Sequence, residues 1–73
     1  MSAAKVFPGF TYVRESRHMH NDIEVSRATI YRQANGCFHV ERFYHMEAAM
    51  SLYNLGEDEA VEEMNEWVDG HTK

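Results

Sequence analysis

The dipeptide Asn35-Gly36, which lies between two runs rich in apolar residues, restricts the fold of this chain more than any other feature. Both central residues of a two-residue type I′ turn need positive φ, and asparagine and glycine adopt such angles at low cost. Residues 23–34 and 37–45 therefore predict the two strands of an antiparallel hairpin. A two-residue loop would place Tyr31 opposite Val40 and Arg27 opposite Tyr44.

The period-two alternation of a strand then assigns the hairpin side chains to two faces. The expected core face carries Ile23, Val25, Tyr31, Phe38, Val40 and Tyr44. The opposite face carries Ala28, Ile30, Arg32, Cys37, His39, Glu41, Phe43 and His45. Arg27 and Arg42 fall on the core side, where we expect them at its edge, with Arg27 over the ring of Tyr44.

The residues before the hairpin predict a strand and a loop. Pro8-Gly9 indicates a turn, and the strand-forming residues of 10–14 predict a strand that follows it. Residues 15–22 are mostly polar and predict a mobile loop. We expect residues 1–9 to form an N-terminal arm.

After the hairpin the apolar period changes from two to about 3.6 residues. Met46, Ala49, Met50 and Tyr53 follow this spacing, which predicts a short helix over 46–55. A second helix is predicted from residue 57 or 58 to Gly70, with Ala60, Val61, Met64, Trp67 and Val68 on its apolar face. The expected fold class is α+β: a three-stranded antiparallel sheet followed by two short helices packed on one face.

Length and cysteine content bound the remaining possibilities. A chain of 73 residues predicts one domain over 1–73, and a chain of this size buries only about 60% of the surface of its unfolded form. The single cysteine excludes an internal disulfide and suits a reducing compartment. No run approaches the roughly 20 apolar residues of a membrane span. We expect a cytoplasmic monomer without a membrane segment.

Cys37, His39 and His45 fall on one predicted strand face and are the candidates for a metal site. Zinc binds such residues, and His18 or His20 would supply a fourth ligand. Paired ligands at recurring spacings are absent, so exposed histidines are the simpler interpretation, and no metal or cofactor is expected. Cys37, His39 and Glu41 also have the residue types of a nucleophilic site, but no pocket-forming sequence surrounds them. We expect a protein without enzymatic activity.

Charge is divided unevenly along the chain. Residues 1–46 carry six basic and four acidic groups, and residues 47–73 carry one basic and eight acidic groups. Glu59, Glu62, Glu63 and Glu66 lie on the polar face of the second predicted helix, which is either a solvated surface or a mimic of nucleic acid. The arginines and aromatic rings of the first part are residue types that bind nucleic acid. A pI of 5.4 argues against such binding.

Aromatic and basic residues near the N-terminus are the best candidates for a partner-binding surface, and the alternative is that they complete the core. Tyrosine, phenylalanine and arginine are common anchors of protein interfaces. The candidate residues are Lys5, Val6, Phe7, Phe10, Tyr12 and Arg14.

In size, acidity, lack of enzyme motifs and predicted strand–strand–helix–helix order, the chain resembles the small host-takeover proteins of lytic bacteriophages. It is most similar in character to phage-encoded regulators of host RNA polymerase. This resemblance implies a protein that binds the polymerase and either displaces the σ factor or causes antitermination. The alternatives are an anti-CRISPR-type inhibitor whose acidic face occupies a nucleic-acid groove, and a small metal- or RNA-binding module.

Overall fold

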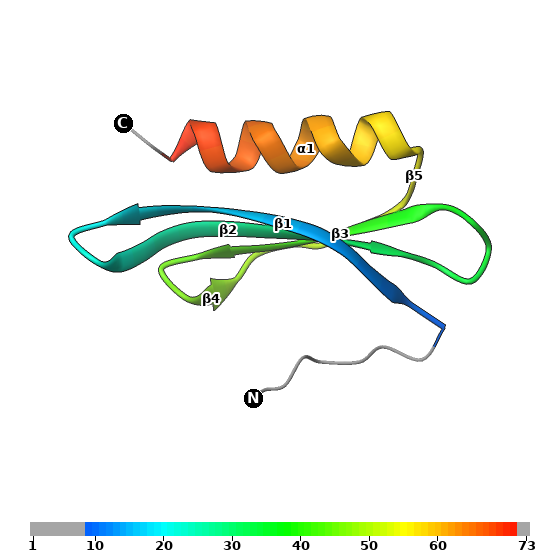
Figure 1. Cartoon of the computed structure of the whole chain (residues 1–73), viewed down its shortest axis with the longest axis horizontal. Helices are drawn as coiled ribbons and strands as arrows, with labels where there is room; N and C mark the ends of the chain where they lie inside the picture. The colour runs from blue at the N-terminus through cyan, green and yellow to red at the C-terminus, as the bar shows by residue number, and fades with distance from the viewer. Residues whose placement is uncertain (1–8, 72–73) are drawn as a thin grey trace.

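A computed structural model describes residues 9–71, in which one antiparallel sheet is covered on one face by a helix (Figure 1). The strands of this part of the chain are β1 (Thr11–His20), β2 (Ile23–Arg32), β3 (Phe38–Tyr44), β4 (Glu47–Ala48) and β5 (Leu52–Leu55), and the helix is α1 (Glu57–Gly70). The strand order is β1-β2-β3-β4, and β5 also pairs with β3. The general α+β class is confirmed, but the predicted three-stranded sheet with two helices is wrong.

The first difference is the length of β1. The segment 15–22, predicted as a mobile loop, instead continues β1 to His20 and turns back at Asn21-Asp22. Asn21 and Asp22 have φ of 53° and 66°, and His20 pairs with Ile23, as a two-residue turn requires. Polar residues are tolerated here because β1 pairs with β2 alone and most of its side chains are at least partly exposed.

The second difference is the register of the hairpin at Asn35-Gly36. Tyr31 pairs with His39 and Ile30 pairs with Val40, one residue away from the predicted register. The Gly36 N–H donates to the Gln33 carbonyl oxygen at 3.0 Å, and Gly36 has φ of 88°. The turn therefore spans 33–36 with glycine as its left-handed last residue, which is the three-residue loop rather than the two-residue one.

This one-residue shift reverses the predicted faces of β2 and keeps those of β3. Ala28 and Ile30 are buried against α1, whereas Tyr31 lies on the opposite face. The predicted assignment of Phe38 and Val40 to the core is correct. The shift also places Arg27 over the ring of Phe43 at 4.3 Å, not over Tyr44, and Arg42 over the ring of Trp67 at 4.6 Å.

The third difference is the segment predicted as the first helix, which forms β4 and β5. Met46 and Met50, expected on a buried helical stripe, are 75% and 74% exposed. Leu52 and Leu55 pack on the core although they are three residues apart, because a register shift opposite β3 adds one residue to β5. Asn54, in this bulge, has φ of 60°. The helix-like spacing of apolar residues in 46–55 therefore comes from a turn after β3 and a bulge in β5.

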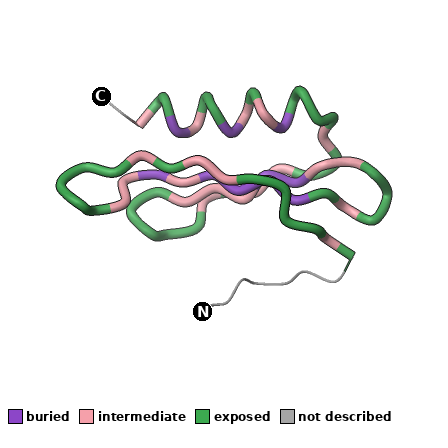
Figure 2. The backbone as a smooth tube through the Cα atoms, viewed as in Figure 1, coloured by how far each residue is buried: buried purple, intermediate pink, exposed green. Residues whose placement is uncertain are grey.

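The second predicted helix is present as α1. Glu57, Asp58 and Glu59 occupy its first turn, where carboxylates interact favourably with the helix dipole. The Gly56 N–H donates to Glu59 Oε1 at 3.4 Å. Ala60, Met64 and Val68 recur every four residues and form one buried cluster with Ala28, Ile30 and Val40. Figure 2 shows the buried segments, in purple, on the side of α1 nearest the sheet and along the middle of the sheet. The core therefore lies between α1 and the centre of the sheet.

Candidate functional site

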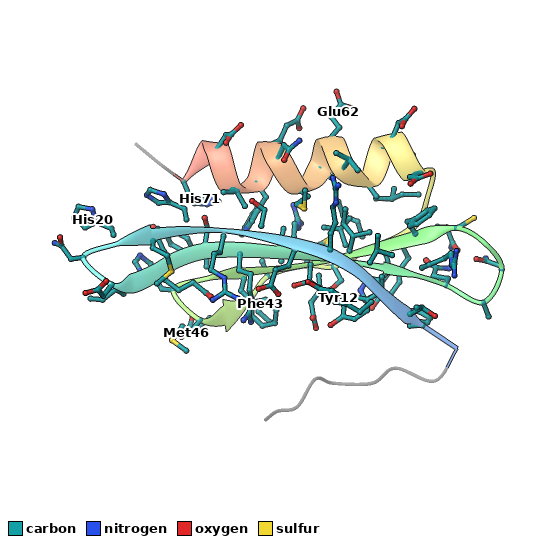
Figure 3. All side chains as sticks on the ribbon, viewed as in Figure 1. Tyr12, His20, Phe43, Met46, Glu62 and His71 are labelled. Atoms are coloured by element: carbon teal, nitrogen blue, oxygen red, sulfur yellow. The ribbon has the colours of Figure 1, made fainter. Side chains whose placement is uncertain are left out.

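The side of the sheet that α1 does not cover, called the open face below, gathers most of the aromatic rings outside the core. Figure 3 shows Tyr12 and Phe43 on this side, and Glu62 and His71 on the side of the helix. Strand alternation and ring contacts place further residues on it. The residues of the open face used below are Phe10, Tyr12, Glu15, Arg17, Glu24, Arg27, Tyr31, His39, Glu41, Phe43 and Tyr53.

Four of these residues form a ring cluster, called the His39 stack. The His39 imidazole stacks on Tyr53 with ring centroids 4.3 Å apart and on Tyr31 at 5.6 Å. Phe10 meets His39 edge-on at 5.2 Å. His39 is 1% exposed and Tyr31 is 8% exposed, so the middle of the open face is closed to solvent.

Burial changes the acid–base properties of this cluster. It lowers the pKa of His39, because the charged imidazolium loses water, and the nearby Glu41 carboxylate opposes this change in part. Burial also raises the pKa of the Tyr31 hydroxyl, and Glu41 adds to the increase. The Tyr31 hydroxyl donates to Glu41 Oε1 at 3.4 Å. Both rings are therefore held in their neutral forms near neutral pH.

The two arginines of the open face lie against two of its three carboxylates. Arg17 contacts Glu15, and its guanidinium lies 3.9 Å from Glu24. Arg27 lies 3.7 Å from the same Glu24 carboxylate while it covers the Phe43 ring. Contact with Glu15 raises the pKa of Arg17 further, which keeps the guanidinium charged. The open face is thus aromatic and locally paired rather than strongly cationic.

The predicted partner-binding residues are distributed over more than one surface. Lys5, Val6 and Phe7 lie outside the described residues. Phe10 and Tyr12 lie on the open face, where Tyr12 is 57% exposed. Arg14 pairs with Ile30, whose side chain is in the core, so the register puts Arg14 on the helix side of β1.

The candidate metal ligands do not converge. Cys37 lies beside the hairpin turn, His39 is enclosed in its ring stack, and His45 is exposed in the turn after β3. Within residues 9–71, no three histidine, cysteine, aspartate or glutamate side chains are arranged to hold a metal ion.

The carboxylates of α1 face away from the sheet. Glu59, Glu62 and Glu66 are exposed and Glu63 is half-buried. In the described part of the chain, no ion pair reaches any of these four residues. The last turn of α1 contains no basic residue, and Nδ1 of His71, just after the helix, lies 2.6 Å from the Trp67 carbonyl oxygen.

Sequence reasoning missed Tyr31, Phe43 and Tyr53 as neighbours on one face. The predicted register puts Tyr31 in the core, and the predicted helix over 46–55 contains Tyr53. Residues 52–55 read Leu-Tyr-Asn-Leu, which lacks the strict apolar–polar alternation of a strand, so no local signal identifies β5.

Comparisons with protein-family models, curated proteins and solved structures find no match to this chain. Among the residues described, no helix has both the length and the apolar character needed to cross a lipid bilayer.

Proposed function

We propose that this chain is a small non-enzymatic regulator that binds another protein through the open face. The observation that carries this proposal is the exposure of Tyr12 and Tyr53, 57% and 55%, on the side of the sheet that α1 leaves uncovered. Tyrosine combines a large apolar ring with a polar end, and it is enriched at protein interfaces for that reason. The strands that carry these rings hold them in place before binding, which reduces the entropy lost on binding.

The electrostatics of the open face favour a protein over a nucleic acid. A polyanion gains affinity by placing its phosphates against unpaired lysine and arginine side chains. Here Arg17 and Arg27 are already held by Glu15 and Glu24. A phosphate backbone would have to compete with these carboxylates, whereas a protein surface of mixed charge would not.

Host RNA polymerase is the partner that we propose, on the strength of the resemblance to phage regulators. The proposed effect is inhibition of initiation through σ displacement, or antitermination, exerted by a monomer in the host cytoplasm. Phe10 and Tyr12 are the described residues of the contact surface. Lys5, Val6 and Phe7 precede them in the chain and are proposed to extend it.

The test is retention of purified bacterial RNA polymerase holoenzyme by the immobilised chain. The unmodified chain should retain the enzyme, Tyr12→Ala should lose it, and Tyr44→Ala should retain it. Tyr44 is a matched control because it is 43% exposed and contacts His71, on the helix side of the sheet. Failure of the unmodified chain to retain polymerase would refute the partner, and equal retention by Tyr12→Ala would refute the surface.

Transcription from a promoter through a terminator, with the same purified enzyme, separates the two proposed effects. Less full-length transcript from the promoter would indicate inhibited initiation. More transcript beyond the terminator would indicate antitermination. The Tyr12→Ala chain should change neither product.

The second candidate function is mimicry of nucleic acid by the outer surface of α1, as in an anti-CRISPR-type inhibitor. The supporting observation is the group of exposed carboxylates Glu59, Glu62 and Glu66, which form no ion pair within residues 9–71. Replacing all three with glutamine should weaken binding to a CRISPR effector complex and flatten its salt dependence. Unchanged binding would show that these carboxylates are only solvated.

A further inference from the structure

His39 joins parts of the molecule that are distant in the sequence. It belongs to β3, and its ring lies 5.6 Å from Tyr31 of β2, 4.3 Å from Tyr53 of β5 and 5.2 Å from Phe10, which leads into β1. It is 1% exposed although α1 lies on the other side of the sheet. One imidazole ring therefore contacts side chains from β5, from β2 and from the residue that leads into β1.

Histidine is the side chain whose ordinary pKa lies closest to neutral pH. A neutral imidazole stacks on flat rings without loss of hydration, but an imidazolium at 1% exposure loses most of its water. Protonation of His39 is therefore opposed by the same packing that closes the stack. Burial correspondingly lowers the pKa of His39.

The groups that face His39 offset only part of the cost of protonating its buried ring. Glu41 of the same strand attracts the imidazolium, and burial remains the larger influence. Tyr31 of β2 stays neutral near pH 7 because burial raises its pKa, and the other rings in contact with His39 are those of Tyr53 and Phe10. Arg27 of β2, on the same face, has a charge of the same sign as the imidazolium and is paired with Glu24.

We propose that the His39 stack is an acid-sensitive latch, which holds β5 and the residues entering β1 on the sheet at neutral pH and releases them when His39 is protonated. Protonation adds one proton to the imidazole from solvent and breaks no covalent bond. The imidazolium regains water most directly when the Tyr53 ring, its closest neighbour, moves away with β5.

The release is confined to β5 because this strand is short, although its opening also exposes Leu52 and Leu55, which pack on the core. Strands β2 and β3 share a ladder from Ser26–Tyr44 to Arg32–Phe38, whereas β5 has four residues and a bulge. The end of β5 is also held by exposed amide contacts, in which the Asn54 N–H donates to Gln33 Oε1 at 2.8 Å. Short elements with exposed hydrogen bonds open at a lower free energy than the central strands.

Opening of the latch would remove Tyr53 from the open face. Binding of the partner should then weaken in acid, a consequence that rests on the proposed function. The latch itself is tested without any partner, so its failure and that of the proposed function are distinguishable.

Amide hydrogen exchange of the whole chain, followed by NMR at about pH 5 and about pH 7.5, tests the latch. After correction for the intrinsic effect of pH, the amides of β5 should lose protection at the lower pH. The amides of Ala28 and Ile30 in β2 should keep theirs. Unchanged protection of β5 would overturn the proposal, and so would an equal loss in β2, which indicates global unfolding.

Two variants identify the group responsible. His39→Phe keeps a ring in the stack and should make the protection of β5 independent of pH. His20→Phe, at an exposed histidine beside the β1–β2 turn, should behave like the unmodified chain. Loss of protection in acid by a folded His39→Phe chain would overturn the proposal. If that variant does not fold, NMR titration of the His39 ring decides, because a pKa at or above the ordinary value of about 6.5 is incompatible with the latch.

Discussion

The Tyr53 ring lies 4.3 Å from the His39 ring and within 12° of parallel, so a strand of four residues places an aromatic side chain over the centre of the open face. The two residues belong to different strands and come together because the bulge at Asn54 allows Leu52 and Leu55 to face the core. Tyr53 is left pointing to the opposite side. The bulge thus serves the core and the candidate site together.

This relationship predicts a stability difference between two substitutions at Tyr53. Tyr53→Phe keeps the stacked ring and should change the free energy of unfolding by less than about 0.5 kcal/mol. Tyr53→Ala removes the ring and should cost about 1–2 kcal/mol, because aromatic pairs add to the free energy of simple burial. Urea denaturation followed by Trp67 fluorescence measures both. Equal stability of the two variants would contradict a stabilising role for the stack.

The acid–base state of Tyr31 predicts a loss of stability in alkali. Its pKa is raised in the folded protein, chiefly by burial, so the folded state retains the phenol proton more strongly than the unfolded state. The resulting contribution is present in full below the ordinary tyrosine pKa of about 10 and is lost as pH rises through the folded value. The measurement is the urea midpoint between about pH 8 and pH 11.

Tyr31→Phe supplies the control for this pH dependence. It keeps the buried ring and removes the titrating hydroxyl, so its urea midpoint should fall less steeply above about pH 10. An identical decline in both proteins would assign the alkaline loss to other groups. Tyr12→Phe, at an exposed tyrosine, should leave the decline unchanged.

The parts of the fold that were predicted correctly depend on local signals. The apolar stripe of α1 follows helical spacing closely enough to identify Ala60, Met64 and Val68 as buried. The hairpin at Asn35-Gly36 was also identified, because few dipeptides adopt positive φ so readily. Its register was not, since Asn-Gly suits both a two-residue and a three-residue loop, and only the packing of Ile30 against α1 distinguishes them.

The open face could not be assembled from sequence for the same reason. A one-residue error in register moved Tyr31 to the wrong side of the sheet, and the helical interpretation of 46–55 removed Tyr53 from it. Both errors concern long-range pairing with β3, which no local pattern encodes. The position of Tyr12 on a strand near the N-terminus follows from local sequence alone. Its role in binding a partner stays a prediction.

The turn after β3 predicts a stabilising substitution. His45 and Met46 have φ of 51° and 68°, a region that glycine adopts without steric cost. Met46 is 75% exposed, so its side chain contributes little to the core. Met46→Gly should therefore raise the free energy of unfolding by about 0.5–1 kcal/mol, after allowance for the greater entropy of the unfolded chain. Met46→Val should destabilise the protein, because a β-branched residue tolerates positive φ poorly. Thermal melting compares the two variants, and a Met46→Val chain more stable than the Met46→Gly chain would contradict strain in this turn.

The acidic surface of α1 also lowers stability. Glu62 lies four residues from both Asp58 and Glu66 on one helix, and all three are exposed carboxylates. Like charges at this spacing repel, whereas opposite charges attract by about 0.2–0.5 kcal/mol per pair. Glu62→Lys should therefore stabilise the protein by about 0.8–2 kcal/mol, and Glu62→Gln by about half as much.

The salt dependence of this gain distinguishes electrostatics from helix propensity, since glutamate, glutamine and lysine have similar propensities. Screening at about 1 M NaCl should remove most of the difference between Glu62→Lys and the unmodified chain. A gain that persists in high salt would assign the effect to propensity or packing. If the electrostatic gain is observed, the unmodified chain keeps these carboxylates at the expense of stability, as is common at the surfaces of natural proteins.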